Sequence, residues 1–388
     1  MNQVKLGIIG LGNMGSGHCN NILAGLTPEI KLTAAADLRP SRRDWAKETL
    51  PDDVVLFENG EQLIESGLCD AVIIATPHYE HPRLAILAFE HGLHVMSEKP
   101  AGVYTKQVRE MNEAAIRSGK VFGMMFNQRT NCVYRKMHEM VQSGKYGQIK
   151  RVNWIITDWY RTQAYYNSGG WRATWDGEGG GVLLNQCPHH LDLFQWFFGL
   201  PVKVRSSVSI GKYHDIEVED DVNTYCKFAD GSTGNFITST GEFPGTNRLE
   251  IMGTRGRMVF EDGVIRFRRT EEDVNHFCRT TPESFPSMTT WDIEVPYKKD
   301  SGNQHQNVVA AFVKAVLDPK AKLVADGEEG IRSVEFGNAM LYSGLKHEDV
   351  AIPMDTAKYD AMLQELIKNS KFVKKEAKAA VVNMSNSY

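Results

Sequence analysis

Residues 4–126 alternate short apolar runs with stretches of helical periodicity. Such alternation is typical of βα units that build a parallel sheet, and continuous apolar runs suit strands that are buried on both faces. The pattern therefore predicts a doubly wound α/β sheet. Its six expected strands span residues 5–9, 32–36, 54–57, 71–75, 94–97 and 121–126.

Beyond residue 127 the expected strands become longer and alternate apolar with polar residues. This period predicts a second α/β domain with a large, mostly antiparallel open sheet that has one covered and one open face. An open face commonly packs against another subunit, so we expect a homodimer or homotetramer. The expected strands are 150–158, 202–211, 221–228, 234–240, 247–252 and 258–261, and the expected helices are 132–143 and 189–198.

The length of 388 residues also favours two domains, since single cores stop growing at about 250–300 residues. We expect a first domain at 1–127, a second at 128–356, and a C-terminal helix and tail at 357–388. Helical stretches at 304–317 and 328–343 are predicted to return and cover the first domain. The tail lysines are interpreted as a solvated face rather than a binding site; they are Lys368, Lys371, Lys374, Lys375 and Lys378.

The composition is that of an ordinary globular protein, with 42% hydrophobic and 24% charged residues. A formal net charge of -4 gives no electrostatic case for nucleic acid, which proteins bind through clustered Lys and Arg, so we expect neither DNA nor RNA as a partner. No apolar run approaches about 18 residues, and the N-terminus enters a strand without the regions of a signal peptide. We therefore expect no membrane association and a cytoplasmic location.

The six cysteines are widely spaced, with no Cys-x-x-Cys pair. They are Cys19, Cys69, Cys132, Cys187, Cys226 and Cys278. We expect reduced thiols rather than a disulfide framework or a zinc cluster. Cys187, inside a motif described below, is either a nucleophile or, as buried cysteines usually are, a small hydrophobic residue. The histidines of the chain lack metal-ligand spacing with carboxylates, which predicts a metal-free site.

A glycine motif, G-L-G-N-M-G, directly follows the first predicted strand and precedes a helical stretch. This is the context of the dinucleotide-binding fingerprint of Rossmann domains. Gly10 suits the tight turn, Gly12 the close approach of a pyrophosphate, and Gly15 the packing of helix on strand. The amides of Asn13 and Met14 begin the helix and are expected to hold the phosphates at the positive end of its dipole.

The second predicted strand ends at Asp37, 22 residues beyond Gly15. A carboxylate there accepts hydrogen bonds from both hydroxyls of an adenosine ribose and repels a 2′-phosphate, which favours NAD over NADP. Arg39, Arg42 and Arg43 follow closely and leave a phosphate-binding arrangement open. The alternative without a cofactor is a glycine-rich turn with a surface aspartate.

Three further motifs accompany the glycine motif. They are Ala75-Thr76-Pro77 with His81, Glu98-Lys99-Pro100 at the end of the fifth predicted strand, and GGGVLLNQCPHHLD at 179–192. Smaller agreements are Asn127-Gln128-Arg129, Trp171-Arg172 and the acidic stretch 217–221. Together the motifs resemble the glucose-fructose oxidoreductase and inositol dehydrogenase family, often called Gfo/Idh/MocA, over nearly the whole chain. The resemblance implies an NAD(H)-dependent oxidoreductase whose cofactor site also includes Thr76, Pro77, His81, Glu98, Lys99 and Asn127.

For catalysis, the resemblance implies that Lys99 lies close to the reacting carbon and that His189 follows the glycine triplet as the base. An alcohol gives up hydride only as its hydroxyl proton departs, and imidazole, with an unperturbed pKa of about 6.5, suits pH 7. Lys99 can stabilise alkoxide character on the same oxygen or relay the proton. The alternative for His189 is a helix-start histidine that bonds backbone groups.

The sequence departs from the family pattern at Asn185, where the family commonly has an aspartate four residues before the histidine. Asn185 can bind substrate hydroxyls through both amide ends, but it holds neither a proton nor a charge. Gln186 and His190 are unusual residues at these positions, and both are candidates for binding the substrate and determining its specificity. Asp192, three residues after His189 on a helix, either orients the imidazole or caps and solvates the helix.

Three more side chains are suited to holding a sugar ring. Tyr160 and Trp171 offer aromatic faces to C–H groups, and Arg172 offers hydrogen bonds to hydroxyls. We therefore predict a dehydrogenase that moves hydride between nicotinamide and a secondary hydroxyl or keto carbon of a sugar, a sugar derivative or a cyclic polyol. Two alternatives stay open: a redox-neutral conversion through a transient keto intermediate with NAD retained, and a non-catalytic nucleotide-sensing regulator.

Overall fold

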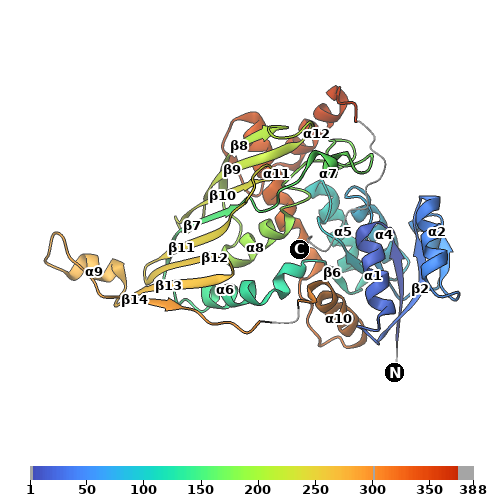
Figure 1. Cartoon of the computed structure of the whole chain (residues 1–388), viewed down its shortest axis with the longest axis horizontal. Helices are drawn as coiled ribbons and strands as arrows, with labels where there is room; N and C mark the ends of the chain where they lie inside the picture. The colour runs from blue at the N-terminus through green and yellow to red at the C-terminus, as the bar shows by residue number, and fades with distance from the viewer. Residues whose placement is uncertain (1–2, 300–301, 375–388) are drawn as a thin grey trace.

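The computed structural model describes residues 3–299 and 302–374, which form two sheets with their covering helices (Figure 1). The first sheet has six parallel strands in the order β3-β2-β1-β4-β5-β6, which confirms the predicted doubly wound sheet. The order in which successive strands are added reverses between β1 and β4, and ligands of such folds bind at the carboxyl ends of the strands there. The strands are β1 (Val4–Ile9), β2 (Ile30–Ala36), β3 (Val55–Phe57), β4 (Ala71–Ile74), β5 (His94–Ser97) and β6 (Phe122–Met124).

Helices cover both faces of this sheet. One face packs against α3 (Gly60–Glu65), α4 (Glu80–Glu90) and α5 (Thr105–Ser118). The other face packs against α1 (Asn13–Leu23), α2 (Pro40–Thr49) and α10 (Gln304–Leu317). The predicted return of residues 304–317 to the first domain is thus confirmed, since Phe312 of α10 is fully buried against strand residues such as Ile8.

The second sheet has nine strands in the order β14-β13-β12-β11-β7-β10-β9-β8-β15, and all neighbours are antiparallel except β7 and β10. The six predicted strands are present. They are β7 (Ile149–Ile156), β8 (Lys203–Ile210), β9 (Glu219–Lys227), β10 (Thr233–Ser239), β11 (Asn247–Gly253) and β12 (Gly256–Glu261). Three strands were not predicted, namely β13 (Val264–Thr270), β14 (Thr290–Glu294) and β15 (Val350–Ala351).

One face of the second sheet is covered by helices, as expected. Along the strands, the buried residues that point to this face alternate with partly exposed residues that point to the other. The covering helices are α6 (Cys132–Gln142), α8 (Pro188–Phe198), α11 (Gly330–Lys346) and α12 (Thr356–Asn369). The prediction that residues 328–343 cover the first domain is therefore wrong in part. Phe336 and Met340 of α11 join the second core, whereas Val334 reaches the first, so that α11 lies between the two sheets.

Helix α12 packs against the second sheet. Tyr359 of α12 is fully buried in that core. Lys368 and Lys371 are exposed as predicted, but Lys374 is not part of a solvated face, because its Nζ donates a hydrogen bond to the Arg172 carbonyl oxygen. Lys375 and Lys378 lie outside the described residues.

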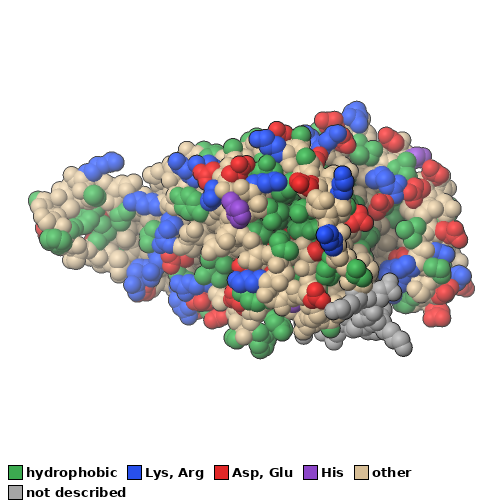
Figure 2. Space-filling model, turned by 90° about the horizontal axis from the view of Figure 1, so that it is seen from above, with side chains coloured by type: hydrophobic (Ala, Val, Ile, Leu, Met, Phe, Trp, Pro, Cys, Tyr) green, Lys and Arg blue, Asp and Glu red, His purple; other side chains and the backbone are tan. Residues whose placement is uncertain are grey.

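A narrow projection extends from the end of the second sheet, between β13 and β14 (Figures 1 and 2). It contains α9 (Val274–Thr280), in which no residue is buried, and the Phe285 side chain, which is 97% exposed. The projection lies at the opposite end of the sheet from β8 and β15. Within the described ranges, no helix combines the length and apolar character that crossing a bilayer requires.

A buried ion pair fixes the helix that carries His189 to the segment directly after the first sheet. Arg129 lies in η1 (Asn127–Thr130), directly after the first sheet, and donates from Nε and Nη2 to the Asp192 carboxylate of α8 at 2.8 and 2.6 Å. Its Nη1 lies 2.6 Å from Glu329 of η2 (Gly327–Glu329). The Arg129 and Asp192 side chains are 3% and 1% exposed, so water reaches neither charge and each is stabilised by the other.

Arg129→Met is expected to lower the free energy of unfolding by about 3–5 kcal/mol, since it leaves the Asp192 carboxylate buried without a partner. Arg268→Met is the matched control, because Arg268 makes the same bidentate contact with Asp292 at 2.7 Å but both side chains are more than half exposed. The control should cost less than about 1 kcal/mol. Equal losses in urea-unfolding experiments on the two variants would contradict the dependence of the buried Asp192 carboxylate on Arg129.

Candidate active site

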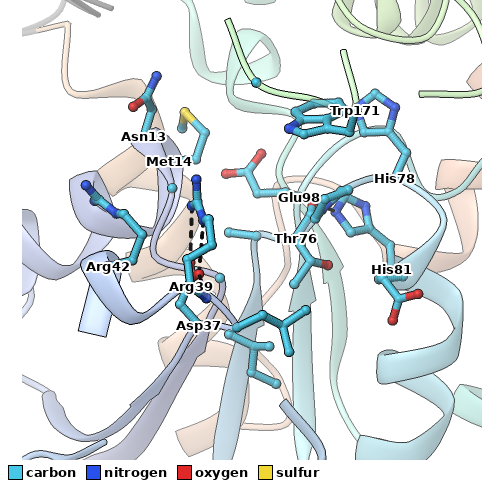
Figure 3. Close-up of a pocket in the computed structure, with 18 of the residues that line it drawn as sticks. Asn13, Met14, Asp37, Arg39, Arg42, Thr76, His78, His81, Glu98 and Trp171 are labelled. Carbon is cyan, nitrogen blue, oxygen red and sulfur yellow. Dashed lines mark hydrogen bonds and ion pairs between the residues drawn. The ribbon is translucent and has the colours of Figure 1, made fainter. Parts of the chain in front are cut away.

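A cavity of about 1660 Å³ opens between the carboxyl edge of the first sheet and a loop of the second domain. Typical small-molecule pockets have volumes of about 300–1,000 Å³, so this cavity has room for a dinucleotide and a second molecule. Figure 3 shows Asn13, Arg39 and Arg42 on one side, and His78 and Trp171 on the other. Predicted cofactor residues that line it are Gly10, Gly12, Asn13, Met14, Asp37, Thr76, Pro77, His81, Glu98 and Lys99.

The glycine turn leaves space for a ligand at one position and requires glycine at two others. A Cβ added at Gly12 would project into the cavity and meet only the Arg39 guanidinium, at 3.9 Å. Gly10 has a φ of +92°, and a Cβ at Gly15 would overlap the Gly10 carbonyl oxygen. Gly15 therefore packs α1 on β1 and does not itself line the cavity. The first turn of α1 opens onto the space beside Gly12, an arrangement that fits a pyrophosphate.

Asp37 ends β2 beside this turn and is charged. Its carboxylate accepts from the Leu11 amide at 2.8 Å and from the Arg39 amide at 2.9 Å, and Arg39 Nε lies at 3.2 Å (Figure 3). Burial raises the pKa of Asp37, but these hydrogen bonds more than offset it and hold the pKa below its usual value. Arg42 is directed to the Leu11 carbonyl and Arg43 to that of Asp37, so both are partnered in the absence of a phosphate.

Two buried contacts hold the strand ends that carry Thr76 and Lys99. The ring nitrogens of His81 lie 2.7 Å from the Thr76 carbonyl and 2.8 Å from the Pro100 carbonyl, which connects the loops after β4 and β5. Glu98 Oε1 lies 2.8 Å from Nε2 of His18 on α1. His81 and Glu98 line the cavity, and their hydrogen bonds fix its floor.

Lys99 and His189 line the same end of the cavity although they come from different domains. Lys99 Nζ donates to the Asn185 carbonyl oxygen at 2.9 Å. Burial lowers the pKa of Lys99, and Arg172 and Arg161 lower it further, whereas Glu98 and Glu178 favour the ammonium form. His189, at the start of α8, has a pKa well below its ordinary value because of burial and the nearby Lys99, so its ring is neutral at pH 7.

Glu178 is a charged residue of this site that the sequence analysis missed. It is fully buried behind Asn185, and its carboxylate accepts from the Asn185 side-chain amide and from the Ala173 amide. Arg172 Nη1 lies 3.7 Å from it. Burial raises the pKa of Glu178, while Arg172 and these hydrogen bonds lower it. Position 185 lacks the carboxylate that the family commonly has there, but the Glu178 carboxylate contacts the Asn185 side chain directly.

Comparison with known proteins agrees with this geometry. Residues 4–126 match the model of the oxidoreductase family with an NAD-binding Rossmann fold, and residues 134–259 match the Gfo/Idh/MocA C-terminal domain. The chain belongs to the Gfo/Idh/MocA oxidoreductase family.

Relatives of this Gfo/Idh/MocA member include a myo-inositol 2-dehydrogenase of Thermotoga maritima, 26% identical over 67% of this chain and 76% of that protein. A scyllo-inositol 2-dehydrogenase (NAD(+)) of Bacillus subtilis is 24% identical over 68% of this chain and 75% of that protein. Among solved structures, levoglucosan dehydrogenase with NADH and levoglucosan superposes with a TM-score of 0.74 at 20% identity, covering 91% of this chain and 100% of that one. The structural likeness shows a shared fold.

Several predicted site residues of this Gfo/Idh/MocA chain lie elsewhere than expected. Asn127 is buried and donates to Gln304 at 3.2 Å, and Tyr160 packs on Phe243 with 42% of its surface exposed; neither lines the cavity. His190 faces away from the cavity. Trp171, Arg172, Asn185 and Gln186 do line it with Lys99 and His189.

His190 lies within a cluster of aromatic rings instead of at the substrate end. The ring centroids of Trp154, Trp159 and Tyr134 lie 5.3, 5.5 and 6.3 Å from its own, and Trp159 Nε1 donates to its Nδ1 at 3.3 Å. Burial lowers the pKa of His190 to about 3. The expectation that it binds substrate is therefore replaced by a packing role.

The structure also bears on the alternatives that the sequence left open for Asp192 and for Cys187. Asp192 pairs with Arg129 and accepts from Gln195 at 2.9 Å, so it neither orients His189 nor faces solvent. Burial raises the pKa of the Cys187 thiol to about 12, which leaves it protonated and favours the hydrophobic interpretation. All six cysteines are free, and no cluster of three metal-binding side chains occurs in residues 3–299 and 302–374.

The low pKa of His190 predicts a specific dependence of stability on pH. Below pH 6.5 the unfolded chain protonates His190, whereas the folded chain does so only near pH 3, so the free energy of unfolding falls as the pH drops through this window. His190→Phe removes this contribution. Relative to wild type, the variant should gain about 2 kcal/mol on going from pH 7.5 to pH 5.0 in urea-unfolding experiments. Parallel pH curves for the two proteins would contradict the assignment.

Proposed function

We propose that this chain is an NAD(H)-dependent dehydrogenase that moves a hydride between nicotinamide and a secondary hydroxyl or keto carbon of a sugar, a sugar derivative or a cyclic polyol. The observation that carries the proposal is the meeting of Lys99 and His189 at one end of a cavity whose other end fits a dinucleotide. The relatives named as inositol and levoglucosan dehydrogenases support a hydroxyl-bearing ring as substrate.

The two side chains have complementary tasks in such a reaction. Bound nicotinamide supplies the hydride acceptor for oxidation and the donor for reduction. His189, neutral at pH 7, accepts the hydroxyl proton as the C–H bond breaks. Lys99 Nζ donates one hydrogen bond to Asn185 and has further N–H groups with which to stabilise the developing charge on the substrate oxygen. In the reverse direction His189 returns the proton to the oxygen.

The cofactor residues support NAD rather than NADP. The Asp37 carboxylate is charged at the end of β2 and would repel a 2′-phosphate. Gly10, Gly12, Asn13 and Met14 would hold the pyrophosphate at the first turn of α1. The Thr76 hydroxyl is buried beside them without a hydrogen-bond partner among the described residues, which leaves it available to the cofactor.

Lys99→Ala and His189→Ala are expected to lower kcat by about 10²–10⁴-fold each while the affinity for NAD is retained. His190→Phe is the matched control, since it alters the neighbouring histidine behind the cavity, and it should keep near wild-type turnover. Inositols, hexoses, glycosides, anhydrosugars and sugar acids would be screened by the absorbance of reduced nicotinamide. Full turnover in both alanine variants would contradict the proposal, and product formed without net reduced nicotinamide would support the redox-neutral alternative instead.

We further propose a cytoplasmic homodimer or homotetramer that assembles through the open face of the second sheet. Ile155 and Ile237 are cross-strand neighbours on β7 and β10 and are only partly buried on that face. Their neighbours on β11 and β12 are charged, since Arg248 lies beside Ile155 and pairs with Glu261 at 2.6 Å. Packing the two isoleucines against a second copy removes them from water.

Ile237→Arg should shift the protein to a smaller species in light scattering coupled to gel filtration, since it places a charge in the proposed interface. Ile116→Arg, on the exposed surface of α5, is the control, because Ile116 is 63% exposed and lies in the first domain. A wild-type monomer, or an oligomer that Ile237→Arg leaves intact, would contradict this interface.

A further inference from the structure

The end of the cavity beyond Lys99 carries an excess of positive charge. The charged residues that line it there are Lys99, Arg161 and Arg172, and no carboxylate of the second domain lines the cavity. The carboxylates that do line it come from the first domain and have partners: Asp37 pairs with Arg39, Glu61 and Glu80 with Arg83, and Glu98 with His18.

Two of these cations are held on one tyrosine ring. The guanidinium carbons of Arg161 and Arg172 lie 5.1 and 4.4 Å from the ring centroid of Tyr165. Arg161 also lies over Trp159 at 5.5 Å, and Arg172 over Trp171 at 4.7 Å. Aromatic faces hold a guanidinium in place without using its N–H groups, which stay available to an acceptor. We call Arg161, Tyr165 and Arg172 the arginine shelf.

The arginine shelf still has hydrogen-bonding capacity. Arg172 Nη1 donates to the Tyr165 hydroxyl at 2.6 Å and Arg161 Nη1 to the Tyr160 carbonyl at 2.9 Å. Arg172 Nε is buried without a partner among the described residues. The Gln186 Oε1 atom, also on this side of the cavity, is likewise buried and unpartnered. Unsatisfied buried groups of this kind are costly unless a ligand or water completes them.

The surrounding acids do not neutralise the shelf. Glu178 contacts Arg172 and Asp158 acts on Arg161, whereas Lys374 adds a fourth cation, because its ammonium reaches the Arg172 backbone. When Lys99 and the neighbouring Glu98 are both counted, four cations thus face three carboxylates. Burial lowers the pKa of Lys374 to about 8; Glu178 opposes this shift and Arg172 adds to it.

We propose that the arginine shelf binds an oxyanion, a carboxylate or a phosphate, on the substrate, so that the substrate class is an acidic sugar or polyol derivative rather than a neutral one. The statement that the acidic molecule is a substrate rests on the proposed dehydrogenase function. The statement that the arginine shelf binds an oxyanion does not. Guanidinium groups match both oxyanions through paired N–H donors. With the anion on the shelf, the ring extends toward Lys99 and His189, which face the same chamber.

The test compares matched ligands on the protein saturated with NADH. Tryptophan fluorescence and calorimetry would measure the binding of glucose, glucuronate and glucose 6-phosphate, and of galactose and galacturonate. We expect one acidic form to bind about 10–100-fold more tightly than its neutral partner at low salt, as charge-assisted hydrogen bonds imply. The glucuronate and phosphate arms distinguish the two oxyanions. Arg161→Gln and Arg172→Gln should each remove the preference, and Arg161→Lys should restore part of it.

Arg117→Gln is the control variant, since Arg117 is 69% exposed on α5 and pairs with a surface glutamate. It should leave ligand preference and NADH affinity unchanged. Equal affinity for acidic and neutral partners would overturn the proposal, as would a preference that survives in both Arg161→Gln and Arg172→Gln. Variants that weaken NADH binding without changing the preference would assign the shelf to the cofactor phosphates instead, which also overturns it. If Arg172→Gln fails to fold, Arg161→Gln alone decides.

The same measurements separate this inference from the proposed function. Shelf-dependent binding of an acidic sugar, with no reduction of NAD by any sugar tested, would leave the anion site intact and refute the dehydrogenase. Oxidation of a neutral sugar, together with equal affinity of the wild-type protein for that sugar and for its acidic form, would support the dehydrogenase and refute the anion site.

Discussion

The buried pair of Arg129 and Asp192 holds the two halves of the active site together. Arg129 follows the last strand of the first sheet, and Asp192 lies three residues beyond His189 on α8. A bidentate contact of this kind permits little sliding or rotation, because both hydrogen bonds are lost together. Movement of α8 away from the segment that follows β6 would leave both charges buried without a partner. The position of His189 relative to Lys99 therefore depends on the contact between Arg129 and Asp192.

The electrostatics of the cavity differ between its two ends in a way that suits one reaction. Near the glycine turn the charges are paired, and the open helix terminus provides a positive potential of fixed direction. Near His189 the cations outnumber the acids, and burial, together with the nearby Lys99 ammonium, lowers the pKa of the imidazole and keeps it unprotonated. Glu178 moderates this excess from a position one side chain removed from the cavity, so that Asn185 remains free to face a ligand through its neutral amide.

Much of the first domain could be predicted because strands buried on both faces produce continuous apolar runs, and the glycine turn must follow one of them. Two of the three missing strands lack a comparable signal, since every residue of β14 is exposed and β15 has two residues. β13 does alternate, with Ile265 and Phe267 buried, so its pattern was present in the sequence. The error at His190 has a geometric cause, since consecutive residues on an α-helix point about 100° apart, so that only one of two adjacent histidines faces the cavity. Glu178 was hidden within a glycine-rich loop whose inward turn no spacing rule describes.

The return of α10 to the first sheet affects how this protein is made. Val308, Val309, Phe312 and Val313 close one apolar face of a sheet whose last strand ends at Met124. During translation, that face emerges early, and α10 covers it only after every strand of the second sheet except β15 has left the ribosome. The nascent chain therefore carries an unfinished hydrophobic surface through much of its synthesis, a state in which chaperones bind and aggregates start. The domain that contains the dinucleotide-binding motif is thus completed only after most of the second sheet has been synthesised.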